Sequence, residues 1–219
     1  ATGGAAAPRR STHDPTNSDE WPMQRYDPAG TSHAVGLSGP TSDVDIDWRT
    51  DLPSWFNGQQ PPIFLDNTVY LCGNGLVAID ANSGAQQFAV RAPAVSTPAR
   101  ADSSVHRTET LVSTSSAGPV GLNRDGGLQL PVVGSLAGTR WRVSSKRRSR
   151  FAEYDPIPPV TVAETAYVVL PETDQLAAIN TTRGSIIWGV GQSSDDIARV
   201  DFRPAVRDNT VYTVNQLGR

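Results

Sequence analysis

The chain has 219 residues, enough for a sizeable core, and its 19 glycines and 17 prolines favour many turns over long helices. The formal net charge of −3 argues against a nucleic-acid-binding protein, and the single cysteine excludes an internal disulfide. Because no apolar run reaches 18 residues, we expect no membrane span. The composition indicates an all-β protein.

The first twenty residues are small, polar and rich in proline and glycine. They cannot bury enough apolar surface to offset the entropy of ordering, so we predict a disordered tether over residues 1–20. A chain that begins with Ala1 fits a mature protein cut from its signal peptide, or a fragment. We therefore expect an extracytoplasmic protein that is secreted or tethered at the cell surface.

Order is predicted to begin at Trp21. Asp43, Asp45 and Asp47 then alternate at strand spacing, which would place three carboxylates on one face. Such a face could bind a cation, but this alternation is more typical of a solvated strand. We predict no metal site there.

Three later segments align with one another: residues 61–90, 158–190 and 203–219. In each, a proline precedes by six residues a threonine that opens the sequence Thr-Val/Ala-Tyr. The first two segments then share Leu-x-Ala-Ile-Asp/Asn, a glycine five residues after the isoleucine and an aromatic residue four further on. The aligned residues are Pro62, Pro159 and Pro204; Tyr70, Tyr167 and Tyr212; Gly84 and Gly184; Phe88 and Trp188. Self-similarity at this period predicts a repeat architecture.

The first repeat predicts four strands separated by short turns. Asp66-Asn67 is a two-residue hairpin turn, since both residues tolerate a positive φ, and the following residues are β-branched or aromatic. The predicted strands are residues 63–65, 68–72, 76–80 and 85–90. Four antiparallel strands per unit form one blade of a β-propeller, in which the repeated aromatic residues fill the gaps between blades.

A degenerate blade is predicted between the two clear ones. Pro98 matches the repeat proline, residues 110–112 the second strand, and residues 120–123 the third. Two insertions interrupt it, one around His106 and one from Pro131 to Asp155. We thus predict a lead-in with a closing-type strand over 21–60, and blades over 61–95, 96–157, 158–202 and, in part, 203–219.

The pattern Val-Tyr…Leu-x-Ala-Ile-Asp-x-x-x-Gly-x-x-x-Phe/Trp resembles the pyrroloquinoline-quinone (PQQ)-like repeat. That repeat occurs in quinoprotein alcohol dehydrogenases and in BamB-like outer-membrane assembly lipoproteins. The resemblance implies that residues 21–32 are a lead-in, that Asp45–Trp48 is a strand of the closing blade, and that about three blades and part of a fourth are present. Complete members have more blades, so we expect a truncated chain whose open edges could self-associate.

The resemblance to dehydrogenases implies a PQQ cofactor held with calcium, against which two adjacent cysteines stack. Cys72 stands alone, and we interpret it as a buried residue of a strand. His13, His33 and His106 are scattered without ligand spacing. We therefore predict no catalytic residue, no metal site and no cofactor, PQQ with calcium included.

A basic run is the sharpest charge feature: Arg140, Arg142, Lys146, Arg147, Arg148 and Arg150. It could attract an anionic partner such as a surface polymer or a nucleic acid. A solvated insertion loop is the simpler interpretation, because only Trp141 and Phe151 interleave with the charges.

Three hypotheses for function remain. The leading one is a non-catalytic propeller that binds an unknown protein or polymer outside the cytoplasm. The second is a fragment of a PQQ-dependent dehydrogenase, and the third is a truncated remnant without independent function. Fold resemblance alone cannot decide between them.

Overall fold

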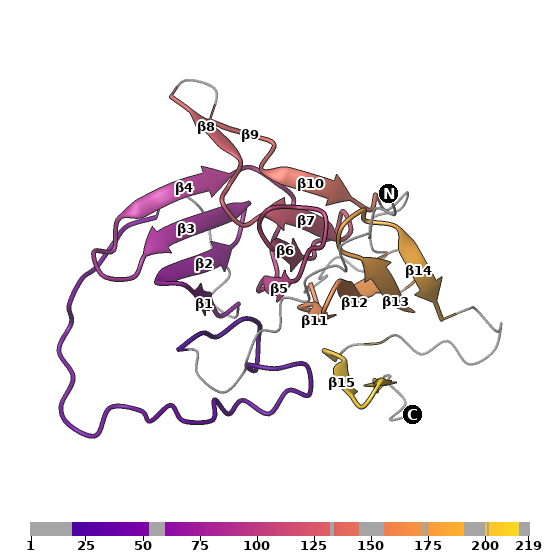
Figure 1. Cartoon of the computed structure of the whole chain (residues 1–219), viewed down its shortest axis with the longest axis horizontal. Helices are drawn as coiled ribbons and strands as arrows, with labels where there is room; N and C mark the ends of the chain where they lie inside the picture. The colour runs from indigo at the N-terminus through magenta and orange to yellow at the C-terminus, as the bar shows by residue number, and fades with distance from the viewer. Residues whose placement is uncertain are drawn as a thin grey trace, which may run out of the picture.

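The computed structural model describes residues 19–52, 60–131, 134–144, 156–171, 173, 175–190, 200 and 202–214. Within these ranges the chain is all-β, as predicted, and no helix is present that could cross a membrane. Three four-stranded antiparallel sheets lie side by side in an arc, and a two-stranded sheet follows them (Figure 1). The predicted tether lies almost wholly outside the described residues.

The first sheet is an antiparallel meander in the order β1-β2-β3-β4. Its strands are β1 (Ile63–Leu65), β2 (Thr68–Cys72), β3 (Leu76–Asp80) and β4 (Gln86–Val90). These bounds confirm the strands predicted from the repeat to within one residue. Asp66 and Asn67 have φ of 40° and 59°, the left-handed pair that a tight hairpin turn requires.

The third sheet repeats this plan in the order β11-β12-β13-β14. Its strands are β11 (Val160–Val162), β12 (Thr165–Leu170), β13 (Gln175–Asn180) and β14 (Ile186–Gly189). Ala178 faces Trp188 just as Ala78 faces Phe88, with the same register shift beside them. A further two-stranded sheet holds β15 (Ala205–Arg207) and β16 (Thr210–Tyr212).

The second sheet differs from the prediction in the position of its fourth strand. Its strands are β5 (Ala99–Ala101), β6 (Thr110–Ser113), β7 (Val120–Asn123) and β10 (Thr139–Arg142), in the order β10-β7-β6-β5. The fourth strand therefore lies inside the region expected to be an insertion from residue 131 to 155. The inserted element is a hairpin of β8 (Leu128–Leu130) and β9 (Gly134–Leu136), which separates β10 from its turn and so hid the repeat.

The predicted strand over Asp45–Trp48 is wrong, because this segment forms no strand. Val44 and Ile46 are 72% and 66% exposed, and the three aspartates expected on one strand face are exposed as well. Trp48 alone is anchored, through a 2.7 Å hydrogen bond from its Nε1 to the carbonyl oxygen of Ala81. The strand-like sequence has no neighbouring strand in the described structure to pair with.

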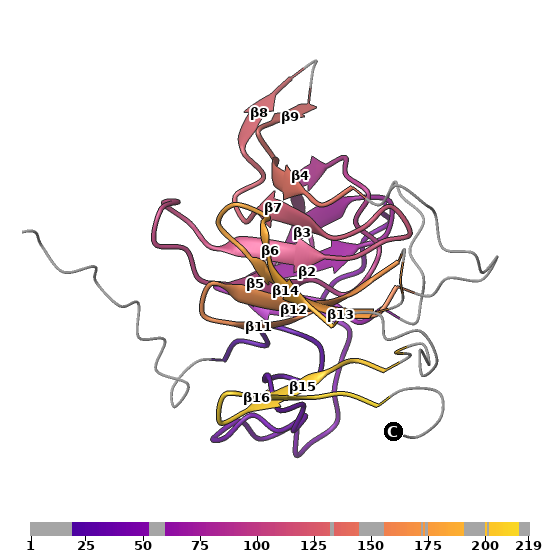
Figure 2. The same ribbon diagram turned by 90° about the vertical axis from the view of Figure 1, so that its right-hand side faces the viewer.

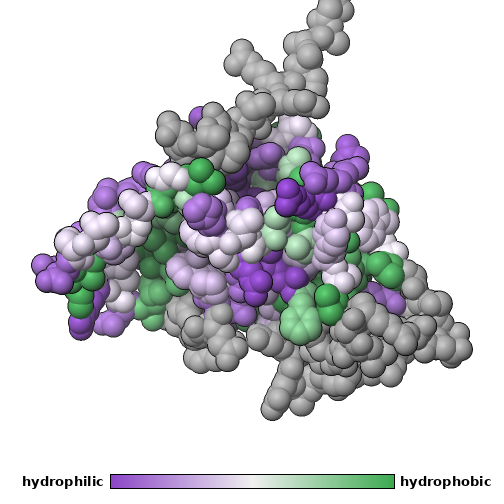
Figure 3. All heavy atoms as spheres, turned by 90° about the horizontal axis from the view of Figure 1, so that it is seen from below, coloured by the Kyte–Doolittle hydropathy of each residue, from purple (hydrophilic) through white to green (hydrophobic). Residues whose placement is uncertain are grey.

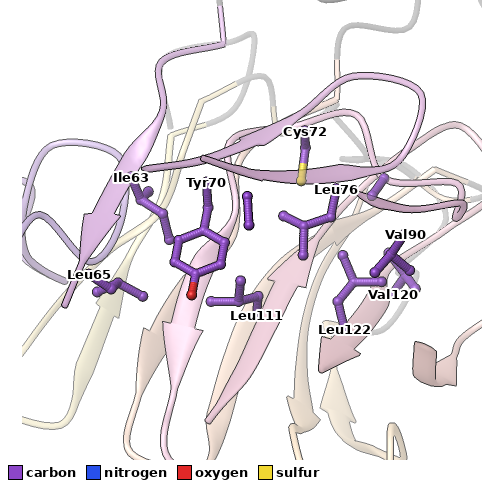
Figure 4. Packing of buried hydrophobic residues seen from close by; sticks show 11 residues of the cluster. Ile63, Leu65, Tyr70, Cys72, Leu76, Val90, Leu111, Val120 and Leu122 are labelled. Atoms are coloured by element: carbon purple, nitrogen blue, oxygen red, sulfur yellow. The ribbon is translucent and has the colours of Figure 1, made fainter. Parts of the chain in front are cut away.

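Apolar side chains fill the space between neighbouring sheets. Figure 4 shows the cluster between the first two, where Leu65, Tyr70 and Leu76 meet Leu111 and Leu122. A second cluster joins the second and third sheets through Trp141. Face-to-face packing of twisted four-stranded sheets is what defines propeller blades, so the fold is a partial β-propeller.

Trp48, before the first blade, and the fourth strands of the first two blades each lay an aromatic ring on a glycine turn of the following blade. A Cβ added to Gly84 would lie 2.6 Å from Trp48 Cε3, and one added to Gly126 would lie 2.7 Å from Phe88 Cε2. Such close approach is open only to glycine. These contacts confirm the interpretation of Phe88 as a blade-packing residue. The equivalent ring of the third blade, Trp188, is 40% exposed.

Candidate binding site

The lead-in segment crosses the inner strands of the propeller. Trp21 and Phe64 exchange two backbone hydrogen bonds, of 2.7 and 3.0 Å. The amide of Arg100 donates to the carbonyl oxygen of Pro22 at 2.9 Å, and that of Val206 to Pro28 at 2.8 Å. The lead-in therefore joins the first and second blades to the strand β15 (Figure 2).

A tight loop gives the lead-in its path. Arg25 and Tyr26 both adopt positive φ, of 61° and 73°, and Gly30 follows at 75°. The Asp27 carboxylate holds the loop closed by accepting hydrogen bonds from the backbone N and the hydroxyl of Thr31, at 2.9 and 2.6 Å. Two consecutive left-handed non-glycine residues carry a conformational cost, which the surrounding contacts must offset.

Met23 fills the space between the inner strands. Its side chain is 4% exposed and packs with Ala99 of β5, Val160 of β11 and Val206 of β15. The flexible thioether side chain suits such an irregular gap. In the described structure the lead-in thus packs across the inner strands β5, β11 and β15.

A pocket of about 230 Å³ remains beside Met23, between the lead-in and the inner strands β5 and β11. Apolar side chains dominate its wall, and Asp27, Arg100 and Asp102 supply charge. Arg100 is paired with Glu20 at 3.1 Å, which leaves the two aspartates to set the polarity. The lining residues are Pro22, Met23, Tyr26, Asp27, Pro28, Arg100, Asp102, Thr161, Val162 and Ala163. This space could hold a side chain or a small amphipathic group, but it is below the usual size of a cofactor site.

Seen from the side that carries the lead-in, the surface is a mosaic of hydrophilic and apolar residues (Figure 3). A mosaic of this kind is typical of non-obligate contact surfaces, whose overall polarity resembles the rest of the protein.

Cys72 lies away from this pocket, in the core between the first two blades (Figure 4). Burial raises the pKa of its thiol to about 12, so it stays protonated at neutral pH. Within the described residues, no three His, Cys, Asp or Glu side chains gather in a way that could hold a metal ion. His106 is part-buried near the carbonyl oxygen of Thr182, His33 is exposed, and His13 lies outside the described residues.

The described structure includes two residues of the predicted basic patch, Arg140 and Arg142. Arg140 is drawn inward, where its guanidinium donates to the carbonyl of Thr108, the hydroxyl of Thr110 and the amide oxygen of Asn123. Arg142 remains exposed at the end of β10. The other four residues, Lys146, Arg147, Arg148 and Arg150, lie outside the described residues.

Sequence reasoning missed one charged cluster. Arg124, in the turn after β7, reaches Asp66 of the first blade at 2.5 Å and Glu109 at 3.0 Å, and its Nε donates to the hydroxyl of Tyr70. The hydrogen bond from Arg124 lowers the pKa of Asp66, and burial raises the pKa of Tyr70. The cluster joins the first two blades through ion pairs. Its residues follow no fixed spacing in the sequence, so the sequence does not predict it.

Comparisons with known proteins agree with this architecture. No protein-family model matches the chain, and no curated protein does. Among solved structures, a europium-containing methanol dehydrogenase is 14% identical with a TM-score of 0.51, covering 81% of this chain and 32% of that one. BamB from Moraxella catarrhalis is 16% identical with a TM-score of 0.49, covering 75% and 49%. The chain thus spans about a third of the dehydrogenase and about half of BamB. At such identity, the likeness to the dehydrogenase shows the fold alone.

Proposed function

We propose that this partial β-propeller is a non-catalytic binding or scaffold module that acts outside the cytoplasm. The observation that carries the proposal is the position of Met23, which the lead-in places among the inner strands β5, β11 and β15. A propeller that closes its inner surface with its own chain has a contact surface there in place of a deep cavity.

The described residues do not fit a PQQ site. The resemblance to quinoproteins implies adjacent cysteines against the quinone, whereas Cys72 is a lone thiol packed in the core between two blades. The inner strands, where several blades converge, are covered by Trp21 and Met23. We therefore derive no chemical step through this cofactor.

The pocket beside Met23 supports a role in binding. Its apolar wall would accept an apolar side chain, and Asp27 and Asp102 would favour a positively charged or hydrogen-bond-donating group beside it. A protein segment with neighbouring apolar and basic residues, or a polymer with amino groups, fits this chemistry. The proposed location outside the cytoplasm is tested by cell fractionation with an antibody.

The enzyme alternative is tested by adding PQQ and Ca²⁺ to the purified chain. The quinone absorbance should show no saturable change, and an artificial electron acceptor should not be reduced when alcohols are supplied. Reconstituted dye reduction would overturn the proposal.

The binding role is tested through the intrinsic tryptophan fluorescence, to which Trp21 contributes with a ring centroid 5.2 Å from that of Tyr26 on the pocket wall. Titration with a library of short peptides and aminated polysaccharides should give saturable changes for basic, partly apolar members. The Asp102→Asn variant should weaken them, while Asp208→Asn, on the exposed turn after β15, should not.

A further inference from the structure

The β8–β9 hairpin is an added element that projects away from the blades. The other two complete blades connect their third and fourth strands by a short turn, and only the second blade carries this hairpin. Both Figure 1 and Figure 2 show β8 and β9 extending away from the four-stranded sheets. Its inner strand, β9, rests against β4 of the first blade.

One face of the hairpin is bare and apolar. Leu128 and Leu136 lie directly opposite each other, and they are 62% and 45% exposed. Leu130 shares their face, because side chains two apart on a strand point the same way. The other face is held by hydrogen bonds, because the side chains of Gln129 and Ser135 both donate to the carbonyl oxygen of Gly126.

The hairpin also lacks the charges that normally protect an exposed strand. No acidic or basic residue occurs from position 126 to 139, in a chain of which 19% is charged. Exposed two-stranded elements usually carry lysine or other charges against unwanted contacts. An uncharged, leucine-bearing projection is therefore suited to entering an apolar phase.

A cationic groove adjoins the base of the hairpin. It has a volume of about 670 Å³, and Arg91 and Arg142 line it with no carboxylate among its described lining residues. Val90 lines the groove as well, and a Cβ added to Gly138 at the hairpin base would lie 2.7 Å from Val90 Cγ1. Groove and hairpin are thus continuous.

We propose that the hairpin and this groove form a peripheral contact with an anionic phospholipid bilayer. The leucine face enters the boundary between headgroups and acyl chains, and the arginines bind lipid phosphates. A narrow, convex, uncharged projection beside basic residues suits a fluid surface better than a preformed protein groove, and the combination of buried apolar area with cationic charge is what holds peripheral proteins on membranes. This inference goes beyond the proposed function and does not depend on the pocket beside Met23.

The test is cosedimentation of the full chain with vesicles. Vesicles of equal parts phosphatidylcholine and phosphatidylglycerol should bind the chain, and vesicles of phosphatidylcholine alone should not. The double variant Leu128→Ser/Leu136→Ser should lose about tenfold or more in affinity. Arg91→Ala/Arg142→Ala should weaken binding and flatten its salt dependence. Val105→Ser and Arg207→Ala, which alter exposed side chains elsewhere, serve as controls and should bind normally.

A second readout guards against folding artefacts. Cys72 is buried, so a single cysteine introduced at the exposed Pro131 can be labelled with an environment-sensitive dye. Its emission should shift to the blue with the anionic vesicles, while a dye at Val105→Cys should not respond. The proposal is overturned if the folded chain does not bind anionic vesicles, or if the leucine variant binds them as well as the wild type does. It is also overturned if the hairpin leucines cause the chain to dimerise without binding vesicles.

Discussion

The indole Nε1 of Trp141, on the fourth strand of the second blade, donates a 2.5 Å hydrogen bond to the carbonyl oxygen of Thr181 in the third blade. Its ring lies on Gly184, three residues further along the same turn. Trp48 repeats this relationship with Ala81 and Gly84 of the first blade. The ring–glycine contact therefore recurs along the described structure, and it predicts the effect of mutations on stability.

Adding a methyl group at Gly184 should break that contact. A Cβ there would lie 2.8 Å from Trp141, and φ at Gly184 is +72°, so Gly184→Ala combines a steric clash with backbone strain. We expect a loss of about 2–4 kcal/mol in the free energy of unfolding, measured with urea. Gly39→Ala is the matched control, since a Cβ there meets no atom within 4 Å. Equal stability of the two variants would contradict the contact.

Replacing Trp141 or Trp188 with alanine should lower the stability by different amounts, because one ring is buried and the other is partly exposed. Trp141 is 8% exposed and Trp188 is 40% exposed, although both occupy the same place in their blades. Trp141→Ala should cost about 3–5 kcal/mol, whereas Trp188→Ala should cost distinctly less. Thermal or urea unfolding of both variants checks this difference, and a larger effect at Trp188 would refute the assignment of blade contacts.

The Arg124 cluster should make stability depend on pH. The hydrogen bond from Arg124 lowers the pKa of Asp66 below its usual 3.8, so the ionised carboxylate favours the folded state. Its contribution is fully present above the pKa of the unfolded chain and is lost as pH falls through the lower pKa of the folded one. Arg124→Met should flatten the fall of the urea midpoint below about pH 4. Parallel curves for the variant and the wild type would show that the pair contributes nothing.

Cys72 should be unreactive in the folded protein. Burial raises the pKa of its thiol to about 12, so almost no thiolate forms at pH 8, and the side chain is enclosed by the core between two blades. A thiol reagent such as dithionitrobenzoate should modify it only as fast as the protein opens, and rapidly in 6 M guanidinium. Fast modification under native conditions would contradict the position of β2 in the core.

The repeat made much of this fold predictable. Short-range signals, such as the Asp66-Asn67 turn and the Leu-x-Ala-Ile pattern, place strands locally, and the structure agrees. The β10 strand escaped prediction because the hairpin separates it from its turn, and Asp45–Trp48 reads as a strand but lacks a partner to pair with. Contacts between distant segments, such as Met23 among the inner strands or Arg124 with Asp66, leave no periodic trace in the sequence.

Hydrogen exchange of the Arg100 and Val206 amides tests whether the lead-in covers the inner strands of the propeller. These amides donate to the carbonyl oxygens of Pro22 and Pro28. They should exchange far more slowly than exposed loop amides and lose that protection in Met23→Asp, which places a charge among apolar inner strands. Rapid exchange of both amides in the wild-type chain would show that the lead-in leaves the inner strands open.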